Sequence, residues 1–153
     1  MDTDRIYVDT SVFGGVFDNE FKKASHVFFN EIKDGKFYLV TSAIVQEEIR
    51  YAPQKVKDLF DSLLPFSEII DVNIESLKLR EEYLKAGIVT KKYSNDALHV
   101  ALATISTCRI IVSWNFKHIV HFKKIPLYNA VNILQGYNQI AIYSPLEVIE
   151  YED

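Results

Sequence analysis

The chain has 153 residues, of which 48% are hydrophobic and 13% aromatic, which suits one compact domain spanning residues 1–153 and excludes a disordered polypeptide. The net charge of −4 excludes a strongly basic nucleic-acid binder, so any contact with nucleic acid must come from a local basic patch or a bound metal ion. Cys108 is the only cysteine, which excludes an internal disulfide and a cysteine-rich zinc site and fits a reducing cytoplasm.

Short apolar runs alternate along the chain with segments of helical spacing. The runs predict strands over residues 5–8, 37–41, 68–72, 109–113 and 139–143. The helical spacing predicts helices over residues 20–34, 42–50, 54–64, 74–86, 94–106 and 128–134, with Ser42 as the N-cap of the second. The acidic end, residues 147–153, is expected to be a solvated tail.

Strands separated by helices predict an α/β fold, with a mainly parallel central sheet and helices on both of its faces. Right-handed crossovers would bring the first and fourth strands to the point where the strand order reverses. Ligands collect beyond the carboxyl ends of the strands at such a point, so polar residues that follow these two strands are candidate site residues.

Asp9 follows the first strand directly and is therefore the first candidate. Glu47 and Glu48 follow the second strand, and only one of two adjacent helical residues can face inward. At about 100° per residue, Glu48 shares an apolar stripe with Ile44 and Val45, whereas Glu47 does not. A buried charge needs a partner or a cation, so Glu48 is either a site residue or salt-bridged to a residue such as Arg50 or Arg5.

Asp96 opens the apolar helix over residues 94–106. It shares a helix face with Val100 and Ala103, which directs it toward packed surface. The alternative is a purely structural role, because the helix dipole stabilises an acidic residue in the first turn. Asn115 follows the fourth strand, where its carbonyl oxygen can bind a hard cation without adding charge or can stabilise a turn. Three carboxylates brought together would repel one another, and oxygen-only ligands favour Mg²⁺ or Mn²⁺ over zinc.

Several short motifs recur here in an order that resembles the PIN-domain family, the nuclease fold of VapC-type toxins. The matching segments are Val8-Asp9-Thr10-Ser11, Ser42 with Glu48 six residues later, the helix opening Asn95-Asp96-Ala97-Leu98, and Val112-Ser113-Trp114-Asn115. The resemblance spans nearly the whole chain and implies a three-layer α/β/α PIN-like fold with about five strands in the sheet.

The resemblance also implies a role for each matching residue. Asp9, Glu48 and Asp96 would bind Mg²⁺ or Mn²⁺, while Ser11 and Ser113 would orient metal waters or carboxylates. The family's fourth acid falls on Asn115, a departure that removes one negative charge from the catalytic set.

The implied activity is hydrolysis of RNA phosphodiester bonds. Lys92, Lys117 and His118 are candidate phosphate contacts, with ordinary solvated charge as the alternative. Tyr93 and Trp114 could stack on bases, although Trp114 is better explained as core. His99 and His118 could be general acids, but a structural role is the simpler interpretation.

The implied partners are RNA and an antitoxin protein, with a homodimer expected. The helices over residues 20–34 and 54–64 hold more Phe and Leu than a small domain usually hides, which suits such interfaces. No membrane contact is expected, because no segment reaches the roughly 18–20 apolar residues needed to span a bilayer.

Two alternatives to the nuclease remain. One is a PIN-like RNA- or protein-binding module weakened by Asn115. The other is a phosphatase of the haloacid-dehalogenase type, which would need a second Asp at position 11, where this chain has Ser11.

Overall fold

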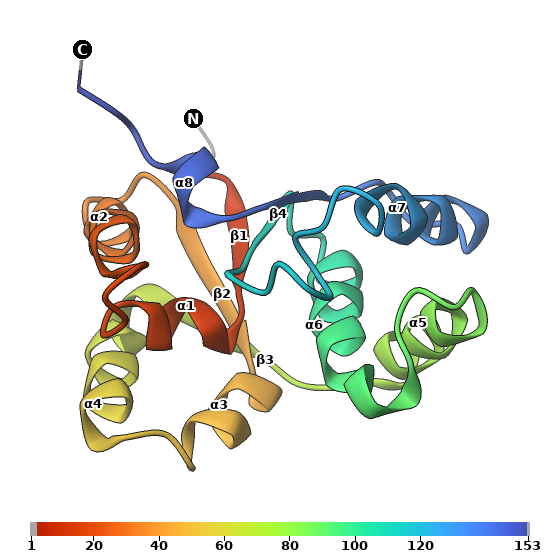
Figure 1. Ribbon diagram of the computed structural model, residues 1–153, viewed down its shortest axis with the longest axis horizontal. Coiled ribbons are helices and arrows are strands. Elements are labelled where there is room, and N and C mark those ends of the chain that lie inside the picture. Colours follow the sequence, from red (N-terminus) through yellow and green to blue (C-terminus); the bar gives the residue numbers. More distant parts are fainter. Residues whose placement is uncertain (1–2, 153) are drawn as a thin grey trace.

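A five-stranded parallel sheet forms the centre of the computed structural model, which describes residues 3–152 (Figure 1). The strands lie in the order β3-β2-β1-β4-β5, so β1 is central and pairs with both β2 and β4. The strand bounds are β1 Arg5–Val8, β2 Tyr38–Ser42, β3 Ser67–Ile70, β4 Ile110–Val112 and β5 Ala141–Tyr143. The predicted three-layer α/β/α fold is confirmed, and the strand order reverses between β1 and β4 as expected.

Helices cover both faces of the sheet (Figure 1). Their bounds are α1 Thr10–Gly15, α2 Lys22–Lys33, α3 Ala43–Ile49, α4 Gln54–Leu63, α5 Ile74–Lys85, α6 Ser94–Ile105, α7 Ile125–Leu134 and α8 Pro145–Val148. Helices α1 to α4 pack on one face and α5 to α7 on the other. None of the helices within residues 3–152 has the length and apolar character that crossing a bilayer requires.

The buried side chains of the central strands alternate between two halves of the core, one on each face of the sheet. Ile6 and Val8 of β1 face the core under α1 to α4, whereas Tyr7 faces the core under α5 to α7. Side chains of a strand point alternately to opposite faces, so a run of buried residues can serve both layers. In β2, Leu39 likewise faces the core under α1 to α4, and Val40 faces the core under α5 to α7.

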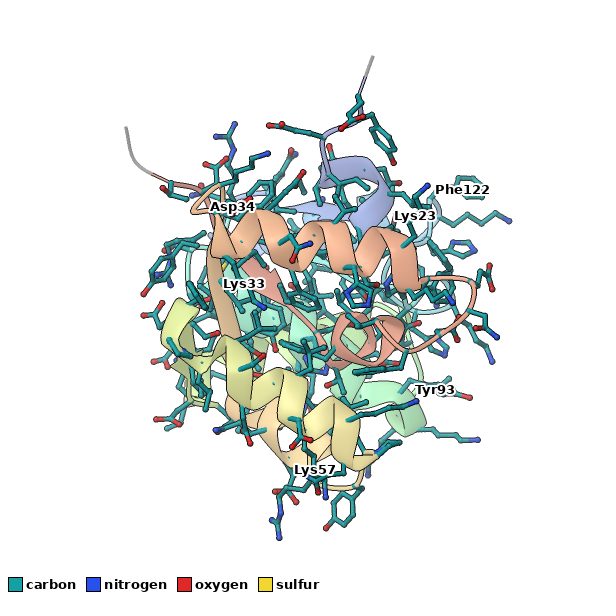
Figure 2. The ribbon with its side chains drawn as sticks, turned by 90° about the vertical axis from the view of Figure 1, so that its left-hand side faces the viewer. Lys23, Lys33, Asp34, Lys57, Tyr93 and Phe122 are labelled. Atoms are coloured by element: carbon teal, nitrogen blue, oxygen red, sulfur yellow. The ribbon has the colours of Figure 1, made fainter. Side chains whose placement is uncertain are left out.

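Helices α2 and α4 cross the face seen in Figure 2, with α1 between them. Both are amphipathic: Lys23 and Lys33 of α2 lie on the outside, while its Phe28 and Phe29 are at most 3% exposed. In α4, Phe60 is likewise buried. These aromatic residues therefore fill the core of the domain.

Two short helices were not expected from the sequence. Helix α1 follows β1 directly because Asp9 caps it, and the pair Gly14-Gly15 forms its last two residues. Helix α8 begins with a capping box between Ser144 and Glu147, so the acidic end is not simply a solvated tail. Other bounds differ by one to three residues. The largest difference is at α7, which begins at Ile125 and not at residue 128. A proline is tolerated in its first turn because an N–H there would have no partner within the helix.

Candidate functional site

Asp9 lies at the carboxyl end of the central strand and is almost fully buried, with 3% of its surface exposed. Its Oδ1 accepts the backbone N–H of Ser11 at 3.1 Å, which caps α1, and the Ser11 hydroxyl at 2.6 Å. Its Oδ2 accepts the hydroxyl of Ser113 at 2.5 Å. Both oxygens are thus held by hydroxyl groups from the ends of β1 and β4, the two strands at the reversal of the sheet.

The two serines also fix the loop that follows β4. The Ser11 hydroxyl oxygen accepts the backbone N–H of Trp114 at 2.8 Å, and that of Ser113 accepts the backbone N–H of Asn115 at 2.9 Å. The sequence motifs around Asp9 and Asn115, about a hundred residues apart, therefore form one hydrogen-bonded unit.

Glu48 rather than Glu47 faces the end of the sheet, in agreement with the helical phase. Glu47 is exposed and pairs with Arg50 at 3.0 Å, while Arg5 pairs with a residue of β3. Glu48 instead accepts the Thr10 hydroxyl at 3.2 Å and lies 2.7 Å from Nε2 of His99. Neither arginine suggested as its alternative partner contacts it.

His99, which the sequence indicated as a possible general acid or, more simply, a structural residue, contacts the site through Glu48. It is 3% exposed, and its Nδ1 lies 2.7 Å from the hydroxyl of Tyr7, which in turn lies 2.7 Å from the hydroxyl of Ser42. The available signal was its position one helical turn after Asp96, on a helix that is otherwise apolar and buried. A histidine in that position faces whatever the acidic residue faces.

Three carboxylates act electrostatically on His99. Burial by itself lowers the pKa of His99, but the hydrogen bond to Glu48 raises it. The negative charges of Asp9, Glu48 and Asp96 raise it further, so the pKa of His99 is raised overall. Of the three acids predicted from the sequence, Glu48 contacts the imidazole directly, while Asp9 and Asp96 act on it only through their charge.

Burial also has the largest effect on the pKa of Asp9. Loss of solvent raises the pKa of this carboxyl, and the nearby charge of Glu48 adds to that. His99 and the hydroxyls of Ser11 and Ser113 lower the pKa but do not cancel the effect of burial. A buried carboxylate whose pKa is raised is a common feature of functional sites, because a cation or substrate can relieve the penalty.

The acidic residues fit a divalent cation only in part. No group of three or more His, Cys, Asp or Glu side chains within residues 3–152 is arranged to hold a metal ion. Mg²⁺, however, usually keeps several waters and binds through one or two carboxylates together with substrate phosphates. The oxygen donors of Asp9, Glu48 and half-buried Asp96 are compatible with that mode, and a site closed by three protein ligands is not present.

Asn115 shapes the loop after β4. Its side-chain carbonyl accepts the backbone N–H of His118 at 2.9 Å, and its backbone carbonyl accepts those of Ile119 and Val120. The turn predicted as one of its two possible roles is therefore present, and the Asn115 side chain is already engaged in it.

The three candidate phosphate contacts differ in exposure. Lys92 and Lys117 are exposed, and the Nζ of each lies 5.5 Å from the centre of the Tyr93 ring. His118 is 9% exposed and stacks on Tyr93 at 3.9 Å between ring centres. Lys92 and Lys117 are thus the two that can meet a phosphate at the surface.

Trp114 belongs to the core, as the simpler interpretation predicted. Its indole N–H donates to the hydroxyl of Ser25 at 2.8 Å, and its ring stacks on Phe21 at 4.2 Å between ring centres. It is 6% exposed and presents no free face to a base.

Residues 6–118 match the family model of the PIN domain. The chain belongs to the PIN domain family. PIN domains are generally nucleases and generally use divalent metals, which is in keeping with acidic residues gathered at the end of the central strand. No curated protein sequence matches the chain.

Solved structures of other PIN-like complexes show the same fold at low sequence identity. VapBC2 from Rickettsia felis, crystallised bound to a DNA fragment from its promoter, matches with a TM-score of 0.58 at 16% identity, over 92% of this chain and 98% of that chain. FitAcB from Neisseria gonorrhoeae matches with a TM-score of 0.60 at 14% identity, over 94% of this chain and 99% of that chain.

Proposed function

We propose that this PIN domain is an endoribonuclease that uses Mg²⁺ or Mn²⁺ to hydrolyse RNA phosphodiester bonds. The observation that carries the proposal is the buried carboxylate of Asp9 at the carboxyl end of the central strand, with Glu48 held nearby through the hydroxyl of the next residue, Thr10. Asp9 lies at the carboxyl end of β1, which is where an open α/β sheet binds its ligands, and Glu48 and Asp96 are contributed by α3 and α6.

The residues that would hold the cation are Asp9, Glu48 and Asp96. A bound divalent cation would supply Lewis-acid polarisation of the scissile phosphodiester. Ser11 and Ser113 hold both oxygens of Asp9 in one orientation, so its carboxylate is ordered before a cation arrives. Asn115 keeps the loop after β4 in its turn and brings no charge.

Two lysines support RNA as the substrate. Lys92 and Lys117 are exposed, and the Nζ of each lies 5.5 Å from the centre of the Tyr93 ring, three residues before Asp96. In a chain of net charge −4, a local pair of lysines beside the acidic site is the kind of patch that a phosphate backbone needs.

We further propose that the protein is the toxin of a toxin–antitoxin pair, acting in the cytoplasm as a homodimer with an antitoxin partner. The support is the fold shared with VapBC2 and FitAcB, together with the buried free thiol of Cys108, which fits a reducing compartment.

A second candidate function is an RNA- or protein-binding module with weakened catalysis. Two observations favour it: Asn115 supplies no charge, and within the described part of the chain no three ligands are arranged around one metal position. Calorimetric titration with Mn²⁺ separates the two candidates. Absence of binding at millimolar metal, with and without RNA, would support the module.

The test of the nuclease is cleavage of single-stranded RNA in Mg²⁺ or Mn²⁺. Asp9→Asn, Glu48→Gln and Asp96→Asn are each expected to abolish cleavage, because each removes one charge from the acidic cluster. Glu47→Gln is the matched control: it changes the neighbouring helical residue, which faces solvent, and should cleave like the wild type. Undiminished cleavage by folded Asp9→Asn and Asp96→Asn variants would refute the proposal.

A further inference from the structure

A continuous chain of hydrogen bonds runs from the N-cap of α3 to the carboxylate of Glu48. The Ser42 hydroxyl contacts the Tyr7 hydroxyl at 2.7 Å, the Tyr7 hydroxyl contacts His99 Nδ1 at 2.7 Å, and His99 Nε2 contacts Glu48 Oε1 at 2.7 Å. The first three residues are at most 3% exposed, so water does not compete for these contacts. The chain links residues of β1, β2, α6 and α3 around one acidic side chain.

The direction of the last hydrogen bond does not depend on the protonation state of the imidazole. An ionised carboxylate only accepts hydrogen bonds, so the contact with Glu48 requires a proton on His99 Nε2. Nδ1 is then free to accept the Tyr7 hydroxyl, or to donate to it if the ring is charged. Tyr7 therefore anchors the ring at one nitrogen while the other nitrogen holds Glu48.

The same contact defines which oxygen of Glu48 can meet a ligand. Oε1 receives both Nε2 of His99 and the hydroxyl of Thr10 at 3.2 Å. Among residues 3–152, no such partner occupies Oε2. Glu48 is about one-third exposed at its side chain, so this second oxygen is the one within reach of a cation or of solvent.

We propose that His99, anchored by Tyr7, is a positioning residue that fixes Glu48 so that this carboxylate offers a single free oxygen, Oε2, to a bound cation. This inference rests on the proposed metal-dependent function. His99 itself is not a ligand, because both of its ring nitrogens are already engaged within the protein. Residues that orient a ligand through one hydrogen bond commonly change metal affinity about 10- to 100-fold when they are replaced.

The first experiment detects the two hydrogen bonds of the His99 ring in the metal-free protein by ¹⁵N NMR of the imidazole. We expect a protonated Nε2 in the wild type and a changed Nδ1 resonance in Tyr7→Phe. The matched control is Tyr83→Phe, which removes the hydroxyl of another fully buried tyrosine that is hydrogen-bonded to Asn132 elsewhere in the core. An unprotonated Nε2, or an Nδ1 resonance that responds equally to both variants, would overturn the inference.

The second experiment measures Mn²⁺ affinity by calorimetry for His99→Leu and His99→Gln, with thermal unfolding as the check on folding. Leu removes the donor, and we expect affinity to fall about 10- to 100-fold. Gln can place an N–H near the position of Nε2, so most of the affinity should return. Equal losses in the two variants would overturn the positioning role, because a donor N–H near the position of Nε2 would then not restore the affinity. A wild-type protein that binds no Mn²⁺ would instead overturn the proposed metal-dependent function.

Discussion

Replacing Asp9 with Asn should stabilise the metal-free protein while it abolishes metal-dependent activity. Burial raises the pKa of Asp9, so the ionised carboxylate is less stable in the folded chain than in water. Asn removes the charge but keeps the cap, because its side-chain carbonyl can accept the Ser11 N–H and Asn is as good an N-cap as Asp. Its amide can donate to Ser113, whose hydroxyl can turn to accept it.

The magnitude follows from the relation between pKa and free energy. Each unit by which the folded state raises a carboxyl pKa costs about 1.4 kcal/mol at neutral pH. We therefore expect the variant to be more stable than the wild type, and each kcal/mol that it gains corresponds to a rise of about 2–4 °C in Tm for a chain of this size. The measurement is thermal or urea unfolding at pH 7 in EDTA, with exposed Asp71→Asn as the control.

The pH dependence of the free energy of unfolding tests the sign of the stability change in Asp9→Asn. In the wild type the folded state binds the Asp9 proton more tightly than the unfolded state does, so stability falls as the pH rises from the ordinary pKa of 3.8 through the raised one. The advantage of Asp9→Asn should therefore be full at pH 7 and vanish toward pH 3.8. A variant that is less stable than the wild type at pH 7, or an advantage that grows on acidification, would refute the reasoning.

Three further experiments test other parts of the structure. Gly15→Ala should lower stability by about 2 kcal/mol in urea unfolding, because a Cβ there would lie 2.7 Å from the indole nitrogen of Trp114 and 2.8 Å from the hydroxyl of Ser25. His118→Phe should raise stability by about 1 kcal/mol in the same assay, because both ring nitrogens of His118 are buried without a hydrogen-bond partner in residues 3–152. Replacing Lys92 and Lys117 with Ala should reduce the salt dependence of single-stranded RNA binding, by about 0.7 in log–log slope for each lost phosphate contact in fluorescence anisotropy. An unchanged slope would remove both lysines from the RNA interface.

The order of elements was predictable because local pattern and tertiary environment agree over most of this chain. Helix α6 is buried from Ala97 to Thr104, while α2 is amphipathic and keeps its lysines outside. The choice of Glu48 over Glu47 needed only helical phase. The short helix α1 was not predicted, and its last residue, Gly15, lies against Trp114, a neighbour about a hundred residues away in sequence.

The hydrogen-bonded part of the site could not be predicted in the same way. Periodicity gives the face on which a side chain lies but not the partner it meets there. His99 could be placed on the face of Asp96, yet its contacts with Tyr7 and Glu48 depend on how α6 crosses the sheet and where α3 begins. The hydroxyls of Ser11 and Ser113 were assigned through family resemblance, and their joint hold on Asp9 follows from the adjacency of β1 and β4.

The charge of the site bears on how many cations it can hold. Asn115 accepts the backbone N–H of His118, which a carboxylate in the same position could do equally well, so the turn does not require an amide. For the proposed metal site, the uncharged Asn115 therefore means one negative charge fewer, while the turn of the loop does not depend on that charge. Three carboxylates remain, one oxygen of Glu48 is taken up by His99, and both oxygens of Asp9 accept hydroxyls. A donor set reduced in this way favours one hydrated divalent cation, with substrate phosphate completing its coordination, over a pair of cations held by the protein alone.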